Sequence, residues 1–508
     1  MTFSTSSFPF DAAGIELDRS RGLSRQLYQT LRQRILDGSL SSGTRLPASR
    51  DLAASLSISR NSVMRAYDQL YAEGFTEGRI GDGTYVAQLP SPSFATKKSI
   101  KLSTKVSTGL PTALSTVSTT HQIIHSTALN LLQQHHLPLP RGDVPRAFRV
   151  GVPAFDLFPF GVWAKLHAAF WRKPDLGRLG YGEPAGDWRL RELISAYLRS
   201  SRGLHCSPGQ IVITSGAQQA ISLCAQLLVE VGDTVAVENP GYRAAAHAFA
   251  IAGAQLHGIG VDNEGMRCSE LLHSDCTLAY VTPSHQYPTG VTMSLARRLE
   301  ILAWAERTQG WIVEDDYDGE YRYSGAPLAP LAALDQSGRV LYVGTFGKIA
   351  FPALRLGYLV LPLGLVEAFS QRRAVDMRHS EVGTQAVMAE FIAAGHFQRH
   401  IRRMRRAALS RRDALLAGWP QEVSGCGAMP KVVAGLHVAV PVATLARERE
   451  LIDKAASVGV EINPLSDYWL PTSAGALDNR AGMVLGFAAV SEPSIHQALA
   501  KLRQVWVD

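Results

Sequence analysis

Apolar residues at helical spacing predict three helices within the first 70 residues. Leu27, Leu31 and Ile35 recur every four residues, which places them on one face of a helix. This pattern stops where a glycine, a residue common at helix ends, follows. Residues 46–53 and 59–70 carry the patterns of two shorter helices, so we expect a small helical unit at this end of the chain.

The two shorter helices have the marks of a helix-turn-helix. Ser49 and Ser59 are suitable N-caps, and residues 56–58 form the bend between the helices. Basic and hydroxyl residues of the second helix lie away from its apolar face. That apolar face consists of Val63, Tyr67 and Leu70.

A helix-turn-helix lays the first residues of its second helix on base edges in the major groove, so Arg60, Asn61 and Ser62 are candidate DNA contacts. Residues 78–86 have hairpin-turn chemistry and include Arg79, as a wing beside DNA would need. The alternative is a small helical bundle whose arginines are merely solvated.

Three apolar runs further along predict buried strands of an α/β sheet. Residues 211–214 lead through a turn of small residues into a helical pattern, which offers backbone N–H groups to a phosphate. Residues 311–317 end in acids, and residues 339–343 come just before Lys348. Because α/β sheets place ligand groups at the carboxyl ends of their strands, these runs indicate one shared site.

Lys348 and its neighbours can hold a phosphorylated aldehyde. A lysine amine forms Schiff bases with carbonyls, and Thr345 and Arg355 offer a hydroxyl and a guanidinium to a nearby phosphate. Asp315 can pair with a protonated pyridine nitrogen. Pyridoxal 5′-phosphate is therefore the candidate cofactor, although a lysine after a strand, taken alone, is usually only solvated.

Together with residues 239–242 and 282–290, these motifs resemble the fold-type I aminotransferase family from about Phe148 to the carboxyl end. The resemblance implies that Lys348 carries the cofactor and that Asp315 pairs with the ring nitrogen. It also implies that Tyr317 contacts the ring's phenolic oxygen and that Tyr242 stacks on the ring. The implied phosphate cup consists of Ser215, Gly216, Ala217, Gln218, Thr345 and Arg355.

The chain departs from that family at several positions. Tyr287 stands where the aminotransferases usually have an asparagine that contacts the phenolic oxygen, and Gly347 stands in place of the expected serine. Residues 483–487 lack the arginine that often binds a substrate carboxylate. Arg480 or Arg243 could substitute, or either could be a surface charge.

Residues 27–86 resemble the winged-helix domain of GntR-family regulators. The motifs that carry the resemblance are residues 46–50, 59–63 and 73–75, which occur in the family's order and are followed by the wing. At position 64 the family often has arginine, whereas this chain has Met64 followed by Arg65. The resemblance implies that Arg50 holds a phosphate, that Arg60 and Ser62 meet the groove, and that Gly81 and Gly83 form the wing tip. Together with Asn61, Arg65 and Arg79, these are the candidate DNA-binding residues. A GntR-type head joined to an aminotransferase-like body resembles the MocR-type regulators.

Composition adds little that changes this picture. The chain has 508 residues, a formal net charge of +7, and five cysteines without a C-x-x-C pair, so we expect no disulfide framework and no metal site. We also expect no transmembrane segment and no secretory signal, hence a cytoplasmic protein. Residues 87–146 hold six basic residues and one acid in a Ser/Thr/Pro-enriched stretch, which is either a solubilising tether or an additional phosphate contact.

The expected domains are a winged helix-turn-helix head at 16–88, a flexible basic linker at 89–146 and a body at 147–508. The body should combine a large, mostly parallel sheet domain with a smaller C-terminal α+β domain. We interpret the chain as a pyridoxal-phosphate-dependent regulator that binds operator DNA as a homodimer and senses the cofactor, a small amine or an amino acid. The alternative is an active aminotransferase with an accessory DNA-binding head.

Overall fold

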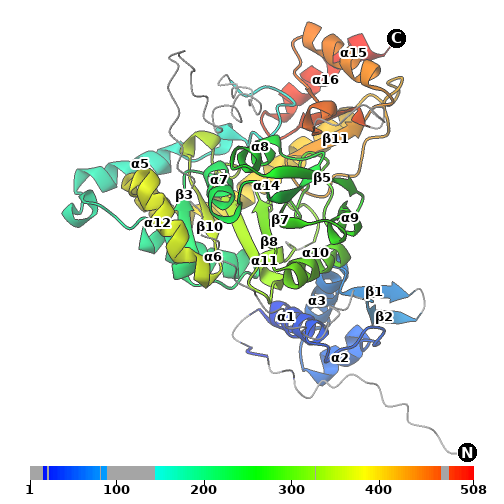
Figure 1. The fold of residues 1–508 in the computed structure, drawn as a ribbon. Coiled ribbons are helices and arrows are strands. Elements are labelled where there is room, and N and C mark those ends of the chain that lie inside the picture. Colours follow the sequence, from blue (N-terminus) through cyan, green and yellow to red (C-terminus); the bar gives the residue numbers. More distant parts are fainter. Residues whose placement is uncertain are drawn as a thin grey trace, which may run out of the picture.

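The computed structural model divides into a head, a large domain and a small C-terminal domain (Figure 1). It describes residues 15–88 except 16, 20, 21, 80 and 81, and then residues 144–325, 328–470 and 480–507. The predicted linker therefore lies mostly outside the described residues. None of the helices in the described ranges is both long and apolar enough to cross a membrane.

The head is a helix-turn-helix with a two-stranded wing, as predicted. Its elements are α1 Leu23–Leu36, α2 Ser49–Ser55, α3 Arg60–Ala72, β1 Thr76–Arg79 and β2 Gly83–Val86. Ser59 caps α3, since its side chain accepts from the backbone N–H of Ser62 at 3.1 Å. The prediction that Ser49 caps α2 was wrong. Ala48 occupies the cap position and Ser49 begins the helix, where its hydroxyl instead accepts from Arg60 Nε at 3.3 Å.

An eight-stranded sheet forms the centre of the large domain. Its order is β3-β10-β9-β8-β7-β4-β5-β6; β10 runs antiparallel to both neighbours, β6 runs antiparallel to β5, and the other pairs are parallel. This confirms a mostly parallel α/β sheet. The strands are β3 Ile211–Thr214, β4 Thr234–Asn239, β5 Gln255–Asp262, β6 Gly265–Met266, β7 Cys276–Val281, β8 Trp311–Asp316, β9 Val340–Thr345 and β10 Gly357–Val360.

Helices cover both faces of this sheet, and their buried sides form separate apolar clusters against it. The helices are α5 Phe160–Arg172, α6 Trp188–Arg202, α7 Ala217–Leu228, α8 Arg243–Ile251, α9 Cys268–Leu272, α10 Leu295–Thr308, α11 Leu331–Leu334, α12 Val366–Met377 and α13 Val382–Ala393.

The small domain is α+β, also as predicted. Its antiparallel sheet has the order β11-β13-β12, and its three helices pack against that sheet. The strands are β11 His437–Pro441, β12 Asn463–Pro464 and β13 Gly482–Gly486, and the helices are α14 His396–Gly418, α15 Leu445–Ser457 and α16 Glu492–Trp506.

The head packs on the large domain beside α10 and α11, at the end of the molecule opposite α15 and α16 (Figure 1). Leu295 of α10 and Leu334 of α11 are buried in the same apolar cluster as the core of the head. Arg32 of α1 donates to the carbonyl of Ala333 at 3.2 Å, and Arg25 donates to carbonyls at the end of α6. The apolar core of the head therefore extends onto α10 and α11 of the large domain.

Candidate cofactor site and DNA-binding surface

A cavity of about 210 Å³ opens where the carboxyl ends of the central strands meet the chain near Val150. The register of the sheet explains why the predicted residues meet there. Asp315 pairs with Val343, so β8 and β9 end side by side and the turn after β9 brings Lys348 next to the acid. The lining residues are Val150, Gly151, Gly216, Ala217, Gln218, Tyr242, Tyr280, Thr282, Tyr287, Asp315, Tyr317, Thr345, Gly347, Lys348, Pro352, Arg355 and Leu356.

All of the predicted cofactor residues except Ser215 belong to this lining in the described part of the chain. Ser215 lies at the edge of the turn, where its backbone N–H donates to the Gln219 side chain at 2.7 Å. The structure thus brings together residues that are more than a hundred positions apart in the sequence.

Lys348 is buried, and its ammonium donates to the carbonyl of Gly151 at 2.7 Å. Burial lowers the pKa of Lys348, while the carboxylates of Asp318 and Asp315 partly oppose that shift. A lowered pKa increases the fraction of neutral amine, which is the form that attacks a carbonyl. Lys348 is therefore suited to bond an aldehyde.

Asp315 stands at the end of β8 with one oxygen free for a ligand. Its Oδ2 accepts from Tyr280 at 2.7 Å, whereas its buried Oδ1 has no partner among the described residues. Burial raises the pKa of Asp315 to about 7, and the hydrogen bond from Tyr280 opposes this shift only in part. A protonated ring nitrogen would supply that missing partner, so the acid fits a pyridine cofactor.

The opposite end of the cavity fits a phosphate. Gly216 has a φ of 89°, and a Cβ there would meet the Arg355 guanidinium at 3.4 Å. Ala217 and Gln218 begin α7 and line the cavity with Arg355. A helix amino terminus beside a guanidinium is a common phosphate site.

Aromatic rings wall the space between these ends. Tyr242 and Tyr317 each meet Tyr287 edge to face, with ring centroids 5.7 and 5.8 Å apart. The Tyr287 hydroxyl donates to the hydroxyl of Tyr468 at 3.3 Å. Tyr287, which replaces the family's asparagine, is thus part of the wall.

The two arginines considered for a substrate carboxylate are engaged elsewhere. Arg243 donates to the carbonyl of Asp467 at 3.1 Å, and Arg480 lies over the Trp469 ring at 5.0 Å. Arg355 is the only arginine among the described residues that line the cavity. Within the described ranges, the cavity thus offers a phosphate clamp without a second guanidinium for a carboxylate.

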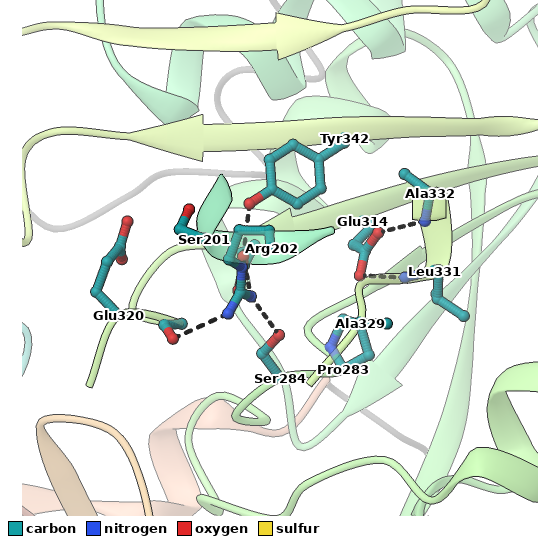
Figure 2. Close-up of polar contacts among 12 residues, drawn as sticks. Ser201, Arg202, Pro283, Ser284, Glu314, Glu320, Ala329, Leu331, Ala332 and Tyr342 are labelled. Atoms are coloured by element: carbon teal, nitrogen blue, oxygen red, sulfur yellow. Dashed lines mark hydrogen bonds and ion pairs between the residues drawn. The ribbon is translucent and has the colours of Figure 1, made fainter. Parts of the chain in front are cut away.

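β8 carries two more buried acids with fixed partners, and Figure 2 shows the first of them, Glu314. Glu314 accepts from the backbone N–H groups of Leu331 and Ala332, at 2.8 and 2.9 Å, and so holds the first turn of α11. Asp316 forms a buried ion pair with Arg202 and accepts from Tyr342 at 2.6 Å. The strand that carries Asp315 is thereby fixed to α6, β9 and α11.

The loop after β7 is fixed in a related way. Arg298 of α10 is buried and donates to the carbonyls of Pro283, Met293 and Ala329, at 2.9, 3.1 and 2.6 Å. It therefore ties the loop that carries Tyr287 to α10 and to the segment that leads into α11, and these two helices contact the head.

The head presents a basic surface at the start of α3. Arg50, Arg60, Asn61 and Arg65 are exposed, and Ser62 is half-buried beside the Ser59 cap, where the two hydroxyls are 2.9 Å apart. In the wing, Gly83 has a φ of 124° and Arg79 ends β1, while Gly81 lies outside the described residues. The exposed side chains of α3 thus lie on the helix that a helix-turn-helix places in the groove.

Sequence reasoning did not identify several residues of this site. Tyr280, which donates to Asp315, lies inside the apolar strand β7, where no neighbouring residue marks it, and Gly151 lies 197 residues from the lysine it contacts. Arg45 contacts the wing, since a Cβ on Gly83 would meet its Nε at 3.2 Å. The position of Arg45 directly before the Leu-Pro-Ala-Ser-Arg segment was the sequence signal that could have identified it.

The fold and these two surfaces define a class of protein: a DNA-binding head joined to a pyridoxal-phosphate-binding body. Comparison with known proteins agrees with this class. Residues 149–431 match the aminotransferase class I and II family, and residues 23–86 match the bacterial regulatory proteins of the gntR family. The chain belongs to both families, in the combined arrangement of the MocR-type transcriptional regulators.

Named relatives share the arrangement over almost their whole length. The chain is 35% identical to the "Probable rhizopine catabolism regulatory protein MocR" of Rhizobium meliloti, covering 97% of this chain and 95% of that one. It is 30% identical to the "HTH-type pyridoxine biosynthesis transcriptional regulator PdxR" of Corynebacterium glutamicum, covering 94% of each. A crystal structure of Pyrococcus horikoshii kynurenine aminotransferase has a TM-score of 0.64 and 28% identity, covering 76% of this chain and 95% of that one. The chain is thus a pyridoxal-phosphate-dependent transcriptional regulator.

Proposed function

We propose that this regulator changes its DNA affinity when pyridoxal phosphate, or a small amine or amino acid that reacts with the bound cofactor, occupies the cavity. The observation that carries the proposal is that Asp315, whose Oδ1 has no partner among the described residues, lines the same cavity as Lys348 and Arg355. An acid, an amine and a guanidinium in one cavity match the ring nitrogen, the aldehyde and the phosphate of this cofactor.

Each predicted residue has a role in this proposal. Lys348 bonds the aldehyde, Asp315 pairs with the ring nitrogen, Tyr317 contacts the phenolic oxygen and Tyr242 stacks on the ring. The phosphate is held by Gly216, Ala217, Gln218, Thr345 and Arg355, with Ser215 at the edge of that cup. The head contacts DNA through Arg50, Arg60, Asn61, Ser62, Arg65 and Arg79, with Gly81 and Gly83 in the wing.

The working form is a homodimer in the cytoplasm, where operator DNA lies. Large apolar side chains that are unusually exposed for a monomer gather between α5 and α6, and Leu176 and Tyr181 are 79% and 90% exposed. A second copy would cover them, and two heads related by a two-fold axis would read two half-sites. Leu176→Asp together with Tyr181→Ser should shift the sedimentation coefficient toward that of the monomer.

Coupling between cavity and DNA requires the effector to prefer one of two shapes. A tenfold preference corresponds to about 1.4 kcal/mol. The contacts of Glu314 and Arg298 support this coupling, because they connect the strand and the loop of the cavity to the two helices that carry the head.

The test is binding to a labelled duplex from the region upstream of the protein's own gene, with and without pyridoxal phosphate, across a salt series. A scrambled duplex and the variant Arg60→Ala are the controls. We expect tight, sequence-selective binding that changes with the cofactor. Weak binding that is equal for both duplexes and is lost with salt would be the phosphate contribution alone, and would contradict the proposal.

Catalytic turnover is the second candidate function. The lowered pKa of Lys348 favours turnover. The contacts of Arg243 with Asp467 and of Arg480 with Trp469 disfavour it, because neither arginine is then free to bind a substrate carboxylate. Adding amino acids to the loaded protein, with and without a keto acid, separates the two. A spectral change that stops after one equivalent indicates sensing, and continued product formation indicates an enzyme.

A further inference from the structure

A buried histidine and a buried aspartate lie directly behind Tyr317. His285 follows β7 in the sequence and Asp318 follows β8, and their side chains are 3% and 1% exposed. His285 Nδ1 is 2.9 Å from Asp318 Oδ2 and 3.0 Å from the Tyr317 hydroxyl oxygen. The Tyr317 hydroxyl itself donates to the backbone carbonyl of His285 at 2.9 Å.

Because the roles of His285 Nδ1 depend on its tautomer, the protons are assigned from the chemistry of its partners. An ionised Asp318 can only accept, so the proton on that side of the imidazole belongs to His285 Nδ1. Nδ1 then donates both to Asp318 and to the Tyr317 oxygen, and it cannot accept from the phenol. Tyr317 therefore keeps its own proton available as a donor.

The imidazole is held in one orientation by its surroundings. A Cβ on Gly435 would be 1.9 Å from His285 Cε1, and a Cβ on Gly290 would be 3.1 Å from Nε2, so backbone crowds both sides of the ring. His437 of β11 packs on the ring with centroids 4.7 Å apart. His285 thus has little freedom to turn its Nδ1 away from Asp318.

We propose that His285 and Asp318 are positioning residues that fix Tyr317 as a hydrogen-bond donor to the phenolic oxygen of the cofactor. Tyr317 lines the cavity, and its proton goes to the His285 carbonyl when no stronger acceptor is present. A negatively charged phenolic oxygen is a stronger acceptor than a neutral carbonyl and would take that proton. The pair thereby influences the proton affinity of the nitrogen that joins Lys348 to the cofactor. A donor on the phenolic oxygen reduces the negative charge next to that nitrogen.

The same cluster also has the donor set of a cation site. One ligand atom each from His285, Asp318 and His437 lie within 4.8 Å of one another. However, the charge of Lys348 contributes to holding the pKa of His437 well below its ordinary value, after burial and the charge of His285. A cation at this position would lie next to that ammonium and be repelled by it. This favours the hydrogen-bonded chain from Asp318 through His285 to Tyr317, called the relay below, over a metal.

Asp318 also acts on Lys348 directly as a charge, so a single variant cannot test the relay. The charged or titratable groups around the cluster, among the described residues, are Arg202, Glu238, Tyr287, Asp315, Tyr321, Arg322, Tyr323, Lys348 and His437. A double-mutant cycle separates the two effects, since a direct charge acts with or without the Tyr317 hydroxyl.

The experiment loads the full-length protein with pyridoxal phosphate and measures the pH midpoint of its visible absorbance band. It compares the unmodified protein with Tyr317→Phe, Asp318→Asn and the double variant. We expect Tyr317→Phe to raise the midpoint by about one pH unit. We also expect the shift caused by Asp318→Asn to differ by at least about half a unit between the proteins with and without the Tyr317 hydroxyl.

Equal shifts in the two backgrounds would overturn the relay and leave Asp318 as a charge alone. Because the inference rests on the proposed role of Tyr317, an unchanged midpoint in Tyr317→Phe would overturn both. If Asp318→Asn does not fold, His285→Gln replaces it in the same cycle. In the same measurement, Tyr280→Phe, which removes a hydroxyl from Asp315 rather than from the relay, should show additive shifts with Asp318→Asn.

Discussion

Replacing Glu314 by glutamine should change the pH dependence of stability by an amount that follows from its burial. Burial raises the pKa of Glu314 from 4.5 to about 7, despite the two backbone N–H groups that it accepts. At about 1.4 kcal/mol per pKa unit, this shift corresponds to roughly 3 kcal/mol. Glutamine has the same shape and no titrating proton.

The sign of the effect follows from which state holds the proton. The unfolded chain ionises above pH 4.5, whereas the folded protein keeps Glu314 protonated until about pH 7. The stability contributed by the neutral acid is therefore fully present below pH 4.5 and is lost as the pH rises through 7. Between about pH 5 and 8.5, we expect the unmodified protein to lose about 3 kcal/mol relative to Glu314→Gln.

Urea unfolding of the unmodified protein and of Glu314→Gln at several pH values measures this difference. The contributions of the other buried acids to the pH dependence cancel, because both proteins contain them. Glu320→Gln is the matched control. Burial also raises the pKa of Glu320 to about 7, but Glu320 accepts from Tyr197 and not from α11. Both variants should show the same pH dependence relative to the unmodified protein.

The two variants should differ in DNA binding. Glutamine offers one oxygen where the carboxyl group of Glu314 offers two, so one N–H of the first turn of α11 loses its partner at a cost of about 1 kcal/mol. That cost corresponds to roughly a fivefold change in the ratio of DNA dissociation constants with and without pyridoxal phosphate. Equal ratios in Glu314→Gln and Glu320→Gln, or a stability difference independent of pH, would refute the reasoning.

Three further predictions use single variants. Lys348→Ala should lose the yellow absorbance of the bound cofactor yet still bind the duplex, and a normal response to effector in this variant would exclude covalent sensing. Asp315→Asn should weaken cofactor binding about tenfold or more in a fluorescence titration, because a charged hydrogen bond contributes roughly 1.5–3 kcal/mol; an unchanged affinity would contradict the ring-nitrogen role. Ser59→Ala should destabilise the head by about 1 kcal/mol in thermal unfolding, whereas Ser49→Ala, which removes no cap, should cost less than half as much.

Local patterns predicted those parts of the molecule that depend on local chemistry. The head was predictable because its apolar spacing, the Ser59 cap and the turn residues all lie within one short segment. Asp315 and Lys348 were predictable because Asp315 lies at the end of one buried strand and Lys348 comes three residues after the end of another. The sequence does not reveal the order of the strands, and the shared ends of β8 and β9 depend on that order.

What the sequence could not show depends on contacts between distant segments. Tyr280 reaches Asp315 because β7 lies beside β8, and nothing near position 280 indicates this. Ser49 has a capping residue type, but the local backbone places Ala48 at the cap, so residue preference alone gave the wrong position. His285 was visible only as part of a motif, and its partner Asp318 belongs to a different loop.

The brevity of α11 has a consequence of its own. Leu331–Leu334 is a single helical turn, and so short a helix has no stability by itself in water. It persists because Glu314 holds its first turn on one side while the head covers Leu334 on the other. If DNA binding separates the head from α11, this turn loses one of its two supports and should unfold locally. Faster amide hydrogen exchange at residues 331–334 on adding DNA would then report the movement of the head.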